Sequence, residues 1–349
     1  MSGQPQWLPA HAKLHTALRD TLLLPRNAHL LVAVSGGQDS LCLARLLLDL
    51  QPKWGWQGGL VHCDHRWRAD SAANARHVQQ LAKQWRLPCY VETAVEPPSS
   101  EAAARHWRYG VFEALAKERG YTGIVTGHTA TDRAETVLYN LLRGSGPDGL
   151  KALGPSRPLS PTATDIQLVR PLLSFTRTET DAVCQQLDLP VWDDATNQDL
   201  RYRRNRIRQE LMPYLRSHFN PNVESILAQT ADILTADVAY LQAQAQTLYN
   251  QIVETTLDGW HIHRDRFRQA PLALQRRVAR RLLQLALDRQ PSFEHIEKIV
   301  ALASAPNLSQ SDPFPGQVIA QIRGDVLWLG RHQPPEPQPP PQAGQNSLS

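Results

Sequence analysis

The chain has 349 residues and a formal net charge of +4, with 42% apolar and 20% charged side chains. This composition excludes a fully disordered or fibrous chain, and the length predicts two or three domains. No uncharged apolar stretch approaches the roughly 18 residues of a membrane helix, and no basic start precedes an apolar run, so we expect neither a membrane span nor a signal peptide. Four scattered cysteines without a CxxC pair favour a reducing, cytoplasmic compartment.

The first 143 residues alternate between helical and extended patterns. Helices are predicted over residues 10–24, 40–50, 70–86, 99–119 and 131–143. Short apolar strands are predicted over residues 30–34, 59–62, 89–92 and 123–126. This alternation is typical of an α/β fold with a doubly wound, mainly parallel sheet, whose ligands bind beyond the carboxyl ends of the strands. Ser99 or Ser100 is the expected cap of the fourth helix.

The rest of the chain changes in character. Residues 144–168 are rich in Gly, Pro, Ser and Thr, which predicts a loop. From about residue 216 the pattern is helical without strand alternation, until residues 317–321 and 326–329 predict a terminal hairpin. The last 17 residues contain six prolines and almost no charge, which predicts a disordered tail. We therefore predict domains over residues 1–215 and 216–332, the second smaller and mostly helical, and a tail over 333–349.

Arginine outnumbers lysine by 31 to 6, and arginines gather in residues 201–216 and 264–281. The planar guanidinium fits phosphate and stacks on bases, so two basic segments on a nearly balanced chain indicate a nucleic-acid surface. The alternatives are a solvated helix face, or pairing with acids elsewhere in the fold.

The most informative motif is Ser35-Gly36-Gly37-Gln38-Asp39-Ser40, between a predicted strand and a predicted helix. Its glycines permit a tight turn and close approach to an anion, toward which the N–H groups of the next helix point. Asp39 would repel a bare phosphate, but it suits a Mg²⁺ ion that bridges to pyrophosphate. Because the lysine of the GxxxxGK[ST] loop is missing, the motif favours ATP cleaved between its alpha and beta phosphates.

The motif resembles the SGGxDS loop of the N-type ATP pyrophosphatase (PP-loop) superfamily. Further blocks are similar to the tRNA(Ile)-lysidine synthetase family within it, closely over residues 28–215 and more weakly over 260–330. These blocks cover residues 62–68 (HxDHxxR), 101–109 (EAxARxxRY), 126–136 (GHxxxDxAET), 143–146, 170–172, 193–197 and 202–208. Two departures are Thr129 and Thr131, where the family often has a histidine and an acid. The chain also lacks the length for the second C-terminal domain of longer members.

The resemblance implies a two-step reaction. ATP adenylates the carbonyl oxygen at carbon 2 of the wobble cytidine in an isoleucine tRNA with a CAU anticodon. The side-chain amine of free lysine then attacks carbon 2 and expels AMP, which gives lysidine. The expected cofactors and partners are therefore ATP, Mg²⁺, lysine and this tRNA, and a homodimer is common for such folds.

Each candidate residue follows from this chemistry. Asp132 and Glu135 share a helix face, and we expect them to hold the cationic lysine or remove its proton. Asp39 is the expected Mg²⁺ ligand, and His128 and Arg105 are further catalytic candidates. The expected ATP contacts are Ser35, Gly36, Gly37, Gln38, Asp39, Ser40, His62 and Asp64. The expected tRNA contacts are Arg108, Arg203, Arg204, Arg206 and Arg208, with Tyr202 as a stacking partner.

Other interpretations remain open at this point. Asp132 and Glu135 could be a surface acid pair, Glu101 could make an ordinary ion pair with Arg105, and His128 could be structural. His62, Asp64 and His65 have the residue types of a zinc site. At the level of the whole chain, the alternatives are a sulfur-inserting tRNA thiolase, a small-molecule amidating ligase, a non-enzymatic RNA-binding protein and a scaffold.

Overall fold

The structure is a computed structural model that describes residues 7–192, 200–201 and 203–331. The predicted tail at 333–349, the family block at 193–197 and Tyr202 lie outside the described residues. The chain divides into two compact units, Met1–Ala236 and Asp237–Ser349, and the division falls within helix α10 (Val223–Ile252). The domain boundary expected after residue 215 stays a prediction.

The first unit is built on a six-stranded, mainly parallel sheet with the order β3-β2-β1-β4-β6-β5. Only β5 runs antiparallel to its neighbour. This arrangement confirms the predicted fold class. The strands are β1 (His29–Ala33), β2 (Gln57–Asp64), β3 (Cys89–Thr93), β4 (Gly123–Thr126), β5 (Ser156–Ser160) and β6 (Ala163–Val169).

The helices of the first unit confirm the predicted ones to within a few residues at each end. Ser100 is the cap of α4, because its side chain accepts a hydrogen bond from the backbone N–H of Ala103. The helices are α1 (Pro9–Thr21), α2 (Gln38–Trp54), α3 (Ser71–Gln84), α4 (Glu101–Arg119), α5 (Ala130–Leu142), α6 (Pro147–Leu150), α7 (Arg177–Gln186), α8 (Arg203–Arg206) and α9 (Met212–His218). A π-helical segment, Ile207–Leu211, joins α8 to α9.

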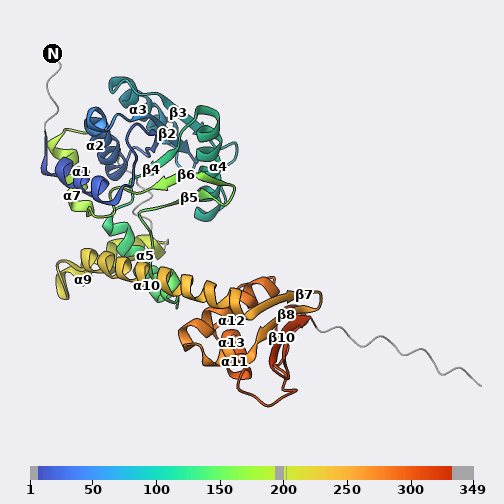
Figure 1. The fold of residues 1–349 in the computed structure, drawn as a ribbon. Coiled ribbons are helices and arrows are strands. Elements are labelled where there is room, and N and C mark those ends of the chain that lie inside the picture. The colour runs from blue at the N-terminus through green and yellow to red at the C-terminus, as the bar shows by residue number, and fades with distance from the viewer. Residues whose placement is uncertain (1–6, 193–199, 202, 332–349) are drawn as a thin grey trace, which may run out of the picture. The chain divides into compact units, whose positions relative to one another are not determined.

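Two apolar cores lie on opposite faces of this sheet, because successive residues of a strand point to opposite sides. Leu30 and Val32 of β1 pack on the face that carries α1, α2, α3 and α7. Leu31, between them, packs on the other face, against α4. Figure 1 shows α4 on one side of the sheet and α1, α2 and α7 on the other. Burial on both faces explains why the central strands are continuous apolar runs in the sequence.

The loop predicted for residues 144–168 is wrong. This segment contains the short helix α6 and the strands β5 and β6, which form an edge hairpin of the sheet. β6 pairs in parallel with β4, and its side chains Ile166 and Leu168 are buried against α4. The Gly, Pro, Ser and Thr residues obscured the strands, because β6 depends on pairing with β4 and β5 depends on pairing with β6, rather than on a local apolar pattern.

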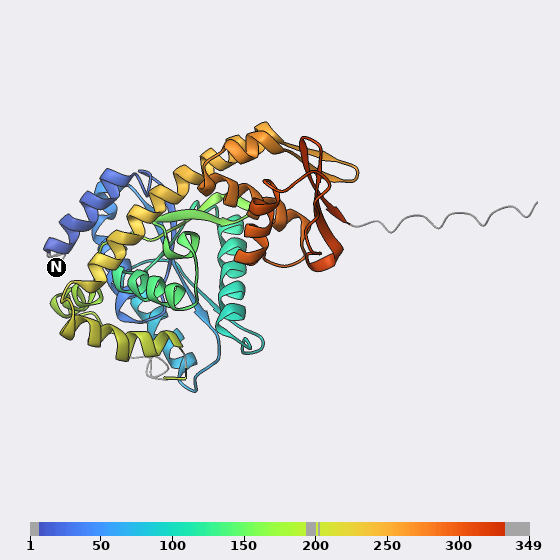
Figure 2. The same cartoon turned by 90° about the horizontal axis from the view of Figure 1, so that it is seen from below.

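The helix α5 lies against the first half of α10 within the first unit (Figures 1 and 2). The hydroxyl of Thr131 donates to Glu224 at 2.6 Å, and Arg133 pairs with Asp232 at 2.6 Å. The buried side chains Ala134, Ile207 and Met212 form a small core beside these contacts. This packing connects the start of α5 with the segment that follows residue 203.

The second unit combines helices with a four-stranded antiparallel sheet of order β7-β8-β10-β9. The predicted terminal hairpin is confirmed as β9 (Val318–Arg323) and β10 (Val326–Arg331). The expectation that no strand precedes it is wrong, because β7 (Val253–Thr256) and β8 (Gly259–His263) pair with it. The helices are the second half of α10, α11 (Arg264–Gln269), α12 (Leu272–Ala286) and α13 (Phe293–Leu302). Among the described residues, no helix is long and apolar enough to cross a membrane.

Candidate active site

The loop between β1 and α2 is a rigid turn held by its own side chains. The Ser40 hydroxyl donates to the Gly37 carbonyl at 2.8 Å and accepts from the Ser35 N–H at 3.1 Å. Gly36 has φ +91°, and a Cβ there would come within 2.3 Å of the side chain of Asn74. Asn74 in turn donates to the Ser35 carbonyl at 2.9 Å. The hydrogen bonds of Ser40 and Asn74 therefore fix the shape of the loop, and its turn at Gly36 requires glycine.

The neighbouring strand ends are close to this loop. A Cβ on Gly127, just after β4, would lie 2.8 Å from the backbone oxygen of Asp39, so only glycine permits this approach. On the other side of β1, the ring of His62 bonds the carbonyl of Val34 at 2.8 Å. Burial lowers the pKa of His62, so the ring is neutral near pH 7. The nearby Asp64 accepts from the backbone N–H of Arg66 at 2.8 Å and orders the next turn.

Asp39 lies in the first turn of α2, where its carboxylate accepts from the Thr180 hydroxyl at 2.5 Å and contacts Arg177 at 3.3 Å. Burial raises the pKa of Asp39 to about 6, although Arg177 opposes this shift. A carboxylate that is destabilised by burial gains from a bound cation. Mg²⁺ is commonly held by one or two carboxylates together with substrate phosphates and water, so the single Asp39 beside a phosphate loop fits it.

Gln38, another predicted ATP contact of the loop, binds the same two residues of α7 as Asp39 does. Its side-chain amide donates to the carbonyl of Arg177 at 2.6 Å and to the hydroxyl of Thr180 at 2.8 Å. Sequence analysis missed Arg177 and Thr180. A usable signal exists, because Thr176 and Glu179 form a capping box that marks the start of α7 just after the last parallel strand.

His128 lies just before α5 and is partly buried, and Asp132 lies in the first turn of α5 and is buried. His128 bonds the Thr126 hydroxyl at 2.9 Å, and burial lowers the pKa of His128 to about 3. The imidazole is therefore neutral at pH 7 and a weak base. Asp132 accepts from the backbone N–H and the hydroxyl of Thr129 at 2.9 and 3.0 Å. Burial opposes its ionisation, but the charges of Arg204 and Arg208 and the hydrogen bond from the Thr129 backbone favour the carboxylate, so the pKa of Asp132 lies below its usual range.

The two acids predicted to hold lysine are already paired with two arginines predicted to contact tRNA. Glu135 is fully buried, and Arg208 grips its two carboxylate oxygens at 2.6 and 2.9 Å. Arg208 also lies 3.2 Å from Asp132. Arg204 lies 3.4 Å from each acid. The surface acid pair considered from the sequence is excluded, because both acids are buried and bridged by guanidinium groups.

The remaining predicted tRNA contacts differ in exposure. Arg108 is half-buried, with its Nε enclosed. Arg203 is exposed, and Arg206 is exposed and only 3.6 Å from Glu210 one turn away. The catalytic candidate Arg105 is half-buried with its guanidinium 4.8 Å from the ring centroid of Tyr109, and burial lowers the pKa of Arg105. Its predicted alternative partner, Glu101, instead approaches Arg204 at 3.9 Å. Of the four predicted tRNA contacts between residues 203 and 208, Arg203 and Arg206 are therefore the exposed ones.

Some of the arginines in residues 264–281 form hydrogen bonds or ion pairs within the second unit. Arg264 donates to backbone carbonyls after α13, including that of Ala303 at 2.8 Å. Arg276 is bidentate to Glu297 at 2.7 and 3.0 Å. Arg266 and Arg268 remain exposed. The alternative of pairing with acids elsewhere in the fold thus applies to part of this segment.

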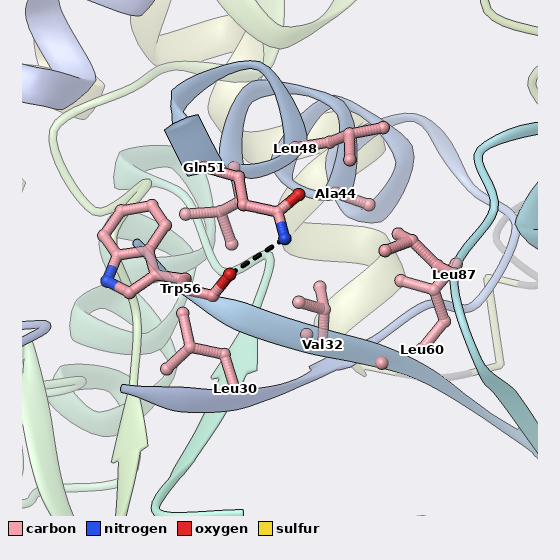
Figure 3. A pocket seen from close by; sticks show the side chains of 11 residues that line it. Leu30, Val32, Ala44, Leu48, Gln51, Trp56, Leu60 and Leu87 are labelled. Carbon is pink, nitrogen blue, oxygen red and sulfur yellow. Dashed lines mark hydrogen bonds between the residues drawn. The ribbon is translucent and has the colours of Figure 1, made fainter. Parts of the chain in front are cut away.

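Two further observations bear on ligands. Within the described ranges, no three His, Cys, Asp or Glu side chains gather as a metal-binding set, so the zinc alternative has no support there. Figure 3 shows an apolar pocket between α2 and the early part of β1 and β2, with Gln51 donating to the Trp56 carbonyl at 2.8 Å. Its cavity volume of about 30 Å³ has room for about two water molecules. It is a packing gap, distinct from the loop edge.

The fold and the loop define this chain as a PP-loop protein: a family model described as the PP-loop domain matches residues 9–215. A tRNA(Ile)-lysidine synthase of Nostoc sp. is 55% identical over 335 residues, which cover 93% of this chain and 97% of that relative. The corresponding protein of Thermosynechococcus vestitus is 51% identical, with 95% and 94% covered. The chain belongs to the tRNA(Ile)-lysidine synthase family.

One solved structure supports the fold independently. The U34-tRNA thiolase NcsA from Methanococcus maripaludis, which carries a [4Fe-4S] cluster, superimposes with a TM-score of 0.54. The match covers 64% of this chain and 77% of that chain at 15% sequence identity. At this identity the likeness concerns the fold alone.

Proposed function

We propose that this chain ligates lysine to carbon 2 of the wobble cytidine of a tRNA(Ile) with a CAU anticodon, and so forms lysidine. The observation that carries the proposal is the match to tRNA(Ile)-lysidine synthases along nearly their whole length. ATP is cleaved to AMP and pyrophosphate, and an adenylated cytidine is the intermediate.

In the first step, the cytidine oxygen attacks the alpha phosphorus of ATP and pyrophosphate leaves. The loop of residues 35–40 and the start of α2 supply N–H donors for the phosphates. Bound Mg²⁺ would neutralise charge on the departing pyrophosphate, and Asp39 is the residue that would hold it. Arg177, 3.3 Å from Asp39, adds a positive charge at the same edge of the sheet.

In the second step, the amine of lysine attacks carbon 2, AMP leaves and the amine loses a proton. Asp132 and Glu135 remain the proposed binding pair for the lysine ammonium. Because Arg204 and Arg208 now neutralise them, lysine must share or displace these guanidinium groups. His128 is too weak a base at neutral pH to take the proton, so we assign it a hydrogen-bonding role instead.

The proposed RNA surface starts with the exposed Arg203 and Arg206, whereas contact by Arg204 or Arg208 requires that they leave the acids. Each phosphate neutralised steepens the dependence of log K on log salt by roughly 0.7–0.9. Arg203→Ala should flatten the slope for tRNA binding by about this amount. An unchanged slope would remove Arg203 from the RNA surface.

The thiolase alternative is disfavoured by the cysteines. Burial raises the pKa of Cys63 and of Cys184 to about 12, so neither thiol ionises readily at neutral pH. Burial likewise raises the pKa of Cys42. A non-enzymatic RNA-binding protein would give no role to the hydrogen-bonded loop at Ser35–Ser40 or to the largely buried Asp39. The homodimer and the cytoplasmic location stay predictions.

The direct test is incorporation of radiolabelled lysine into a tRNA(Ile) transcript with a CAU anticodon, in the presence of ATP and Mg²⁺. We expect label that depends on ATP and on the wobble cytidine, with AMP formed in equal amount. A transcript with uridine at the wobble position is the matched control. Cleavage of ATP to AMP without lysine in the tRNA would retain the adenylation chemistry and overturn the identity of the nucleophile.

A further inference from the structure

Three aromatic rings gather just beyond the carboxyl end of β2, among residues to which the proposed reaction assigns no role. The ring of His65 lies 5.2 Å from that of Trp67 and 5.0 Å from that of Trp107, centroid to centroid. We name these three residues the tryptophan cluster. Trp67 keeps 45% of its surface exposed, although a ring of this size gains from burial. Nearly half of Trp67 is therefore accessible to solvent, three residues beyond the end of β2.

The exposed ring is held in place from two sides. The carboxylate of Asp64 accepts from the backbone N–H of Arg66, which has φ +57°, and this turn presents Trp67. The indole N–H of Trp67 donates to the carbonyl of Pro98 at 2.8 Å, and Arg66 donates to the carbonyl of Val95 at 2.7 Å. Because the ring is already ordered, a ligand that stacks on it loses little side-chain entropy.

Unsatisfied polar groups accompany the cluster. Within the described part of the chain, Nδ1 of His65 and Nε of Arg108 are buried without a hydrogen-bond partner. Such orphaned groups are costly, and a ligand with polar edges would relieve that cost. Burial and the charge of Arg108 lower the pKa of His65 to about 4, so its ring is neutral and available for stacking. An aromatic face beside a guanidinium group is the combination that binds unpaired nucleotides.

We propose that the tryptophan cluster stacks an unpaired anticodon-loop base adjacent to the cytidine that reacts. This inference rests on the proposed function, because it takes the substrate to be a tRNA. The competing occupant is the adenine of ATP. The exposure of Trp67 and the flanking Arg108 favour RNA, because a base in a continuous strand needs an open face and brings a phosphate with it.

The experiment measures two dissociation constants on the full chain: one for the CAU-anticodon tRNA(Ile) transcript by filter binding, and one for ATP by calorimetry. Trp67→Ala should raise the Kd for the transcript about 5- to 140-fold, the range expected for loss of one stacked base. Trp67→Phe should restore most of the affinity, and the Kd for ATP should not change. Trp7→Ala is the matched control, because Trp7 is also 45% exposed and stacks on a histidine, His11.

Each outcome decides the proposal. A raised Kd for ATP with unchanged transcript binding would assign the cluster to adenine and overturn it, and no change in either constant would leave the cluster purely structural. If Trp67→Ala does not fold, wild type and Trp67→Phe are compared instead by tryptophan fluorescence. Transcript should then quench an emission component that the Phe variant lacks, and equal quenching in both would contradict the proposal. Absence of lysine incorporation by wild type would refute the proposed function but leave these binding measurements interpretable.

Discussion

Removal of Arg208 alone from its ion pair with Glu135 should strongly destabilise the first unit. Glu135 is fully buried, and both of its carboxylate oxygens are bound by Arg208 at 2.6 and 2.9 Å. Breaking a buried pair by removing one partner costs about 3–5 kcal/mol, since the other charge is left without compensation. Because Arg204 still contacts Glu135 at 3.4 Å, Arg208→Ala should cost near the lower limit, about 3 kcal/mol.

For a unit of this size, that loss corresponds to a fall in Tm of about 6–12 °C. The assay is thermal unfolding of the full chain followed by circular dichroism. Arg206→Ala is the matched control: it removes an arginine two residues away whose exposed pair with Glu210 is worth about 0.3–0.5 kcal/mol. If the falls in Tm of Arg208→Ala and Arg206→Ala differ by less than about 2 °C, the reasoning is refuted. A double-mutant cycle with Glu135→Gln and Arg208→Gln would then measure the coupling directly.

Three further predictions concern the loop edge and one cap. Because the pKa of Asp39 is raised to about 6 from 3.8, its neutral form favours folding below pH 4, and this contribution is lost as the pH rises through 6. Asp39→Asn should therefore raise the free energy of unfolding by up to about 3 kcal/mol at pH 8 and by little at pH 4, as measured by thermal melts, while it abolishes ATP use. An equal gain in stability at pH 8 and pH 4 would contradict this. Gly127→Ala should weaken ATP binding at least tenfold, measured by calorimetry, because the added Cβ clashes with the Asp39 backbone. Gly110→Ala is the control and should not weaken it, because nothing lies within 4 Å of a Cβ there. Equal ATP affinities of the two variants would refute the close approach of Gly127 to Asp39. Ser100→Ala should lower Tm by about 2–4 °C through loss of the cap on α4, and an unchanged melt would show that the cap contributes nothing.

The sequence by itself determined the parts whose cause is local. Continuous apolar strands such as 30–34 predict burial on both faces of a parallel sheet, because no face is left for water. The glycines and serines of residues 35–40 predict the phosphate loop, since backbone geometry and helix N-termini act within a few residues. The helix caps and the terminal hairpin belong to the same class.

Tertiary structure decided what depends on distant partners. β6 is a strand because β4 offers it a parallel edge, although its own residues suggest a loop. Asp132 and Glu135 meet Arg204 and Arg208 across about seventy residues of chain, and no local pattern pairs acids with arginines at that separation. The tryptophan cluster likewise joins the end of β2 to α4. Charges and rings act over a few ångströms of space, and only the folded chain determines which of them lie that close.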